Sequence, residues 1–185
     1  MREHGVLNRI LLIYEHYERQ LSNAKQDLDP AVLNSAAGII LHFIEDYHEK
    51  LEEDFLFPRF VRAGKLVELV QTLRAQHQAG RKVTTKILTL AKNGFRASED
   101  RRTLGNSLAQ FIGRYRPHKA REDTVLFPAL RSIISAHEYA ALGETFENKE
   151  HQLFGKDGFK GIVEQVAGLE QRLGIYDLSQ FTPRA

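Results

Sequence analysis

Two stretches of the sequence carry the same polar motif, in which a histidine is followed four residues later by a glutamate and then by Leu-Phe-Pro. DYHEKLEEDFLFPRF at 46–60 and RPHKAREDTVLFPAL at 116–130 align without a gap. The motif therefore occurs twice, which indicates an internal duplication of the chain. Its polar members are His48 and Glu52 in the first copy, and His118 and Glu122 in the second.

A lone histidine precedes each copy of the motif. His4 lies 44 residues before His48, and His77 lies 41 residues before His118. The repeated unit is thus a lone histidine, then His-x-x-x-Glu, then Leu-Phe-Pro. Imidazole nitrogens and carboxylate oxygens are common metal ligands. The pattern predicts a metal centre to which the two halves of the chain contribute equally.

The potential ligands fall on the apolar faces of predicted helices. His118 and Glu122 continue a stripe that begins at Leu104 and repeats every three or four residues, and His48 and His77 continue similar stripes. All four histidines are therefore expected to point into the core. Burying carboxylates without a partner is costly, so the two glutamates need a compensating charge, which metal ions would supply. A buried polar network is the alternative interpretation.

The types of donor available narrow the choice of metal. The chain has no cysteine, which excludes disulfides, iron–sulfur clusters and thiolate zinc sites. Nitrogen and oxygen donors favour iron or manganese over a structural zinc site, and we expect two iron ions, with manganese as the alternative. Four histidines and two bridging glutamates would leave open coordination positions for solvent and for a small exogenous ligand.

Six helices are expected to position these side chains. Apolar residues recur at three- and four-residue spacing without strand-like alternation, so the fold class is all-α. Residues 1–130 are predicted to form an up-down four-helix bundle with a pseudo-two-fold internal repeat, and 131–185 a C-terminal helical extension packed on the same domain. The proline of each Leu-Phe-Pro motif is expected to end or kink its helix. The predicted helices are 3–27, 31–56, 65–92, 98–126, 136–154 and 158–173.

Composition argues against several classes of function. The 26 basic and 24 acidic residues nearly cancel and are scattered, so neither nucleic acid nor an anionic membrane is an expected partner. Glu3, His4, Asn8 and Arg9 interrupt the N-terminal apolar residues too early for a signal peptide. No later segment has the roughly 20 apolar residues of a membrane span. The cytoplasm is the expected compartment.

Residues 1–130 resemble the hemerythrin and HHE cation-binding family, in which a four-helix bundle presents the same series of ligands. The stretches REHGVL, FIEDYHEKLEEDFLFPRF, LRAQHQAGR and YRPHKAREDTVLFP are similar to those of a bacterial subgroup. The resemblance implies a non-haem di-iron site that binds oxygen, peroxide or nitric oxide. The ligands that it implies are His4, His48, Glu52, His77, His118 and Glu122.

The sequence departs from the oxygen-carrying animal members of that family at one ligand. Those proteins have two histidines four residues apart on the third helix, whereas here Leu73 and Arg81 stand at the positions around His77. One iron would therefore lack a ligand. His151, in FENKEHQLFG after the bundle, is a predicted seventh ligand that a fifth helix could lay across the open end.

Further polar residues accompany the predicted ligands. Tyr14 and Tyr115 lie on the apolar stripes, where a phenol could donate a hydrogen bond to a bound oxygen species or serve as an ordinary core residue. The other acidic groups near the motif are expected to be solvated or to support the ligands: Glu45, Glu49, Glu53 and Asp123.

Three functions are compatible with these features. The first is a protein that binds or senses oxygen or nitric oxide at an open iron position without turnover. The second is an enzyme whose di-iron centre consumes peroxide or nitric oxide, and which would need an electron donor that the sequence does not identify. The third is an interaction module with a structural metal, in which the last fifty residues form the face of a homodimer.

Overall fold

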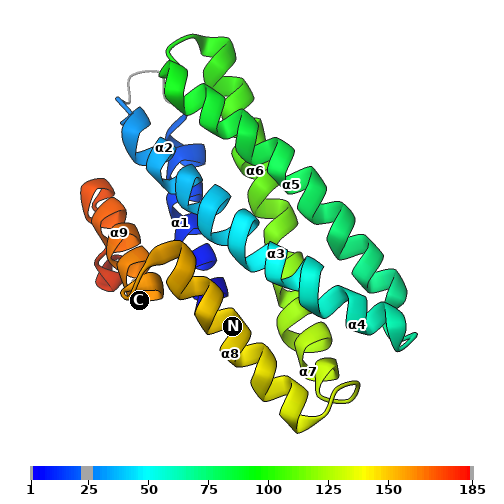
Figure 1. Ribbon diagram of the computed structural model, residues 1–185. Helices are drawn as coiled ribbons and strands as arrows, with labels where there is room; N and C mark the ends of the chain where they lie inside the picture. The colour runs from blue at the N-terminus through cyan, green and yellow to red at the C-terminus, as the bar shows by residue number, and fades with distance from the viewer. Residues whose placement is uncertain (1, 22–26, 184–185) are drawn as a thin grey trace.

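The computed structural model describes residues 2–21 and 27–183 of the chain, and this part is all-α. Four helical columns form an up-down bundle, and two further helices pack along one side of it (Figure 1). The columns are α1 (Arg2–Leu21); the run from α2 (Pro30–Ile39) through α3 (Glu49–Leu51) to α4 (Phe57–Arg62); α5 (Val67–Asn93); and α6 (Ser98–Arg121), continued by α7 (Phe127–Leu130). The additional helices are α8 (Ala136–Phe154) and α9 (Gly158–Leu173).

Local sequence signals explain most of the helix boundaries. Asp29 caps α2 by accepting a hydrogen bond from the backbone N–H of Ala31, and Pro30 occupies the first turn, where no N–H is needed. Ser135 and Glu138 form a capping box that begins α8. Gly94 closes α5 in a left-handed conformation, at a φ of 80°. The helices predicted for 136–154 and 158–173 have the bounds of α8 and α9.

Each proline of the Leu-Phe-Pro motifs was expected to end or kink its helix, and the structure shows that neither proline ends it. In each copy a five-residue π-helical segment comes first, Glu52–Leu56 and Glu122–Leu126. The N–H of Phe57 then donates to the carbonyl of Glu52, five residues back. Each proline thus occupies the first turn of a new α-helical segment, where its missing N–H breaks no bond. The wider turn lets both columns continue, to Arg62 and to Leu130.

A third π-helical segment, Ile40–His48, links α2 to α3. All of the π-helical segments therefore lie next to the histidines and glutamates of the repeated motif, in the part of the chain that the structure describes. Such segments shift the register of a helix by one residue and are frequent at functional sites. Here they set the rotation at which His48 and Glu52 enter the core.

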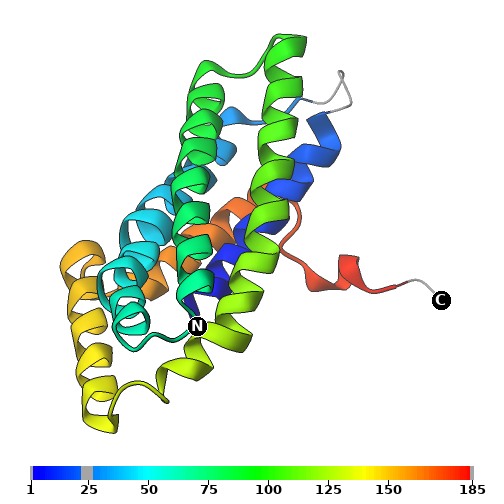
Figure 2. The same cartoon turned by 90° about the vertical axis from the view of Figure 1, so that its right-hand side faces the viewer.

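The larger of two apolar clusters runs through the bundle and includes residues of the extension. Ile162, Val166 and Leu169 of α9 are buried in the same cluster as the residues of α1 and α2. Leu142 of α8 belongs to a second cluster, with Leu56 and Leu126, at the end of the bundle that carries the Leu-Phe-Pro motifs. Figure 2 shows α8 beside α4, with the segment after α9 leading away from the bundle. No helix in the described residues is long and apolar enough to cross a membrane.

Candidate metal centre

Four histidine side chains meet in the core of the bundle as two pairs. The Nε2 atoms of His4 and His48 are 3.0 Å apart, and those of His77 and His118 are 3.1 Å apart. The four residues come from the four columns and are buried. Each pair therefore joins the lone histidine and the His-x-x-x-Glu histidine of the same repeat. We call them the first pair and the second pair.

The two glutamates of the repeat lie between the pairs. For Glu52, Oε1 is 3.5 Å from Nε2 of His48 and Oε2 is 3.5 Å from Nε2 of His77. Glu122 likewise places Oε2 3.4 Å from Nε2 of His4 and Oε1 3.0 Å from Nε2 of His118. Each carboxylate thus faces both histidine pairs, one oxygen to each. This is the arrangement of a bridging ligand.

These distances fit metal ions held by both pairs. At metal–nitrogen bonds of about 2.1 Å, two ligands at right angles lie about 3 Å apart, as the paired Nε2 atoms do. Both side-chain oxygens of Glu52 and Oε1 of Glu122 are buried without a hydrogen-bond partner among the described residues. Carboxylate oxygens that are buried and unbonded are costly unless a cation compensates for them. The residues therefore fit a two-metal centre.

Electrostatics at the site follow from burial and close contact. Burial, and then the neighbouring charge of Glu122, raise the pKa of Glu52 well above its usual range. Burial acts on Glu122 as well, but the facing imidazoles of His118 and His4 outweigh it and hold the pKa of Glu122 below its usual value. Burial, and next the adjacent His4, lower the pKa of His48 to about 3, so its imidazole stays neutral, as a metal ligand requires.

The outer nitrogens of three histidines contact oxygen acceptors. Nδ1 of His4 is 3.0 Å from Oδ1 of Asp123, and Nδ1 of His77 is 3.0 Å from Oε1 of Glu53. Each partner comes from the opposite repeat. Asp123, which follows Glu122, contacts the lone histidine of the first repeat, and Glu53, which follows Glu52, contacts that of the second. A proton held on Nδ1 in this way leaves the Nε2 lone pair directed at the centre.

His118 has the third of these contacts, through Gln76. Its Nδ1 is 2.7 Å from the side-chain oxygen of Gln76, whose backbone carbonyl accepts a hydrogen bond from Arg114. The guanidinium of Arg114 lies against Gly80, where a Cβ atom would collide with it. The glycine thus makes room for the arginine that holds Gln76, and Gln76 in turn orients His118.

Arg81 lies one turn after His77, at a position where the resemblance to oxygen-carrying members of the family would place a second histidine. Its guanidinium forms ion pairs with Glu49 at 3.1 Å and with Glu53 at 2.8 Å. The arginine cannot act as a metal ligand, but its single positive charge offsets part of the negative charge of the two carboxylates that lie beside His77. One potential ligand atom from each of Glu49, Glu53 and His77 lies within 4.8 Å of the other two. The only local signal for this network is the helical spacing of His77 and Arg81.

Tyr14 and Tyr115, the tyrosines predicted to lie near the ligands, have different environments. The hydroxyl of Tyr115 donates a hydrogen bond to Oε1 of Glu49 at 2.5 Å, so its contact is with that carboxylate and not with a histidine of the centre. Burial, followed by the charge of Glu49, raises the pKa of Tyr115 well above its usual value, so the phenol keeps its proton. The hydroxyl of Tyr14 is buried with no hydrogen-bond partner among the described residues.

His151 lies apart from the other predicted ligands, contrary to its prediction as a seventh ligand. Its side chain is exposed on α8, and it belongs to none of the groups of close ligand atoms in the described residues. Its neighbour on α8, Glu150, turns inward instead and is buried. Adjacent residues of a helix differ in direction by about 100°, which explains why only one of the two faces the bundle.

Aromatic rings cover the histidines. Phe57 stacks on the imidazole of His77 with ring centres 5.5 Å apart, and Phe127 lies 5.8 Å from that of His4. Each ring again belongs to the opposite repeat. A hollow of about 200 Å³ lies beside His118 of the second pair, lined by Leu69, Thr72, Leu73, Gln76, Pro117, His118 and Arg121.

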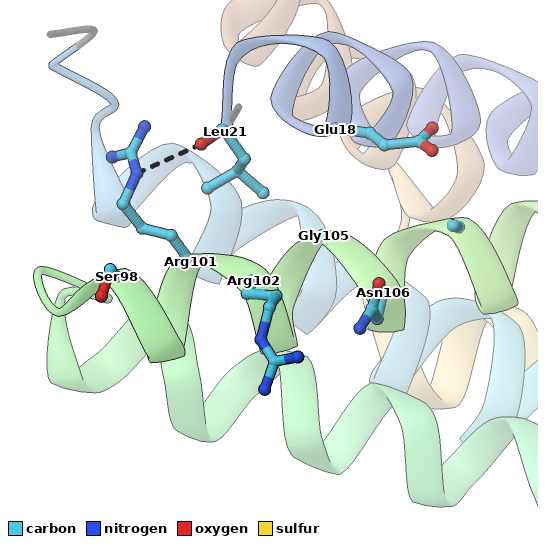
Figure 3. Close-up of a pocket in the computed structure, with 8 residues that line it drawn as sticks. Glu18, Leu21, Ser98, Arg101, Arg102, Gly105 and Asn106 are labelled. Carbon is cyan, nitrogen blue, oxygen red and sulfur yellow. Dashed lines mark hydrogen bonds between the residues drawn. The ribbon is translucent and has the colours of Figure 1, made fainter. Parts of the chain in front are cut away.

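A pocket of about 490 Å³ lies elsewhere, between the end of α1 and the start of α6 (Figure 3). Arg101 at its rim donates to the carbonyl of Leu21, and no predicted ligand lines the pocket. Leu21 is 17 residues along α1 from His4, or about 25 Å at the rise of an α-helix. The pocket is therefore separate from the centre.

Comparison with known proteins places the four-column bundle in a family. The hemerythrin HHE cation binding domain matches residues 1–130. Proteins described as uncharacterized from Mycobacterium bovis and Mycobacterium tuberculosis are 52% identical over 185 residues, which cover 99% of this chain and 72% of each relative. No solved structure matches the chain significantly. The match to the family ends at the last residue of α7.

Proposed function

We propose that this chain, which belongs to the hemerythrin HHE cation-binding family, holds two iron ions and reversibly binds oxygen or nitric oxide. One observation carries the proposal: two histidine pairs are joined by two buried glutamates whose oxygens face both pairs. Its proposed ligands are His4, His48, Glu52, His77, His118 and Glu122. Manganese remains the alternative metal.

The site would leave room for a small ligand. Each metal would receive two imidazoles and one oxygen from each bridging glutamate, which is four donors from the protein. Iron centres of this donor type commonly take more ligands than four, so positions stay open to solvent or to a diatomic molecule. The iron ions would supply the electrons and the open position that such binding requires.

The residues around the ligands would set the environment of the bound molecule. Glu53 and Asp123 fix the ring orientation of His77 and His4 through their Nδ1 atoms. Phe57 and Phe127 cover the imidazoles and limit the access of water. The hollow beside His118 is small, which favours oxygen, nitric oxide or peroxide over an organic substrate.

Metal analysis and spectroscopy test the proposal together. Protein purified without chelator should contain two irons per chain, and reduced protein should develop a visible charge-transfer band on exposure to oxygen, reversed by degassing. A folded protein that binds neither iron nor manganese would refute the proposal and leave a buried polar network. Iron that gives no spectral response to oxygen or nitric oxide would favour a structural metal.

The buried Tyr115 favours one second candidate, a di-iron enzyme that consumes peroxide or nitric oxide. Its phenol donates to Glu49, which adjoins His48, and its ring centre lies 5.8 Å from that of His118. An oxidisable phenol this close to an iron centre could take part in electron transfer. Stopped-flow mixing of reduced protein with peroxide discriminates the two functions: catalytic loss of peroxide supports the enzyme, and stoichiometric, reversible uptake of oxygen supports the binder.

A further inference from the structure

His4 is the one proposed ligand at the end of a helix. It is the third residue of α1, whereas His48, His77 and His118 each lie more than a turn inside a continuous helical column. The first turn of a helix lacks part of its backbone hydrogen bonds and opens more readily than the interior. A ligand in that turn keeps a fixed position only if other contacts hold the turn in place.

Contacts from outside the family-matched bundle hold this turn, and Glu150 of α8 makes them. Its Oε2 accepts a hydrogen bond and ion pair from Arg2 at 2.5 Å, and a second bond from the hydroxyl of Tyr47 at 3.3 Å. Arg2 is two residues before His4, and Tyr47 is adjacent to His48. One carboxylate is therefore tied to both helices that supply the first pair.

The surroundings of Glu150 show a specific fit. Its Oε1 accepts a hydrogen bond from the backbone N–H of Phe159 at 3.1 Å, and the residue is 4% exposed. A Cβ atom at Gly158 would approach Oε1 to 2.8 Å, so the glycine at the start of α9 makes room for the carboxylate. Arg2 also lies over the ring of Phe159, at 4.6 Å. These donors compensate for the burial of the charge, which otherwise would be costly.

We propose that Glu150 is a positioning residue for the metal centre, which fixes His4 and His48 by holding Arg2 and Tyr47. The inference rests on the proposed metal site. It makes the C-terminal helices part of the support of that site, although they lie beyond the residues that match the family. Its expected consequence is selective: loss of Glu150 weakens binding at the first pair and leaves the second pair unchanged.

The chain contains a matched control for a merely structural role. Glu170 of α9 is also 4% exposed, and it pairs with Arg9 of α1 through two hydrogen bonds, at 3.0 and 2.5 Å. Both carboxylates thus join the extension to α1 through an arginine. Arg9, however, is five residues past His4, in the interior of the helix, so its loss should not move the ligand.

The experiment compares Glu150→Ala with Glu170→Ala, and Arg2→Ala with Arg9→Ala. Metal-free protein is titrated with ferrous iron without oxygen, and in parallel with manganese, and both binding steps are fitted. We expect Glu150→Ala and Arg2→Ala to weaken one of the two steps by about tenfold or more, the size seen when support of a ligand is lost. The Glu170→Ala and Arg9→Ala variants should keep both steps as in the wild type. Equal behaviour of the two sets would overturn the inference.

Hydrogen exchange of the metal-free proteins provides a readout that needs no metal. The amides of residues 6–8, which bond back to the first turn, should exchange about tenfold faster in Glu150→Ala than in Glu170→Ala. Equal exchange would refute the role of Glu150. Arg2 is half-exposed, so Arg2→Ala keeps the test valid if Glu150→Ala does not fold. Failure of the wild type to bind metal would refute the proposed function instead, so the two failures are distinguishable.

Discussion

The two histidine pairs have the same internal geometry but different supports. Their Nε2 separations, 3.0 and 3.1 Å, agree closely. The second pair lies between two long helices and is held from inside the bundle, by Glu53 and Gln76. The first pair includes a helix end, and its support comes from Asp123, whose side chain is 39% exposed, and from the C-terminal extension.

This difference shows that duplication of a ligand motif does not duplicate its surroundings. The ligands repeat because each unit supplies a lone histidine, a second histidine and a glutamate. The supports differ because His4 lies in the first turn of α1, whereas His77 lies in the interior of α5. We therefore expect two binding steps of unequal affinity, the second pair being the tighter one.

Removal of a bridging glutamate should have the largest effect on metal binding, because each bridging glutamate contributes an oxygen to both pairs. Glu52→Ala takes away one oxygen from each pair, so both metals should be lost, with affinity reduced by about 100-fold or more. Elemental analysis after dialysis measures the result. Glu144→Ala, which removes an exposed glutamate of α8, is the control and should retain both metals. A Glu52→Ala protein with full metal content would contradict the bridging assignment.

Equivalent substitutions at the outer nitrogens should give a smaller effect that differs between the pairs. Glu53→Gln should weaken metal binding at the second pair by about 10- to 100-fold, because Glu53 is nearly buried and shared with Arg81. Asp123→Asn should weaken the first pair by about tenfold at most, since its carboxylate is partly solvated. Titration with ferrous iron distinguishes the two. A larger loss of metal affinity in Asp123→Asn than in Glu53→Gln would contradict the prediction that the second pair depends more strongly on its outer carboxylate.

Removal of the phenol of Tyr115 should lower stability rather than metal content. Tyr115→Phe leaves Oε1 of Glu49 without its donor, at a cost of about 1–3 kcal/mol. For a chain of this size, each kcal/mol corresponds to about 2–4 °C in Tm. Thermal unfolding followed by circular dichroism measures the shift. Loss of iron in this variant would contradict the expectation and would mean that the hydrogen bond to Glu49 also supports the metal ligands.

The smallest effect is expected at His151. His151→Ala should change neither the metal content nor the free energy of unfolding by more than about 0.5 kcal/mol, because the side chain is exposed. The neighbouring Glu150→Ala provides the contrast on the same helix. A metal deficit in His151→Ala, measured by elemental analysis, would restore the prediction of a seventh ligand.

Features that depend on residues close together in the chain were predictable from the sequence, and features that depend on distant residues were not. Helical spacing placed His4, His48, His77 and His118 on buried faces, and the structure brings all four together. The bounds of α8 and α9 were likewise predictable, because caps and glycines act within a few residues. The continuation through Pro58 was not predictable, because proline ordinarily ends or kinks a helix and no local residue pattern indicates the π-helical turn before it.

The sequence by itself determined the fold class, the duplicated ligand motif and the inward direction of its histidines, because each depends on periodicity within one helix. Only the tertiary structure decided which groups support those ligands. Three features depend on how the helices rotate and pack against each other. They are the ion pairs of Arg81 with Glu49 and Glu53, the support of His77 by Glu53 and of His4 by Asp123, and the inward direction of Glu150 in place of His151. That rotation is set by contacts between residues far apart in the chain, which no local pattern contains.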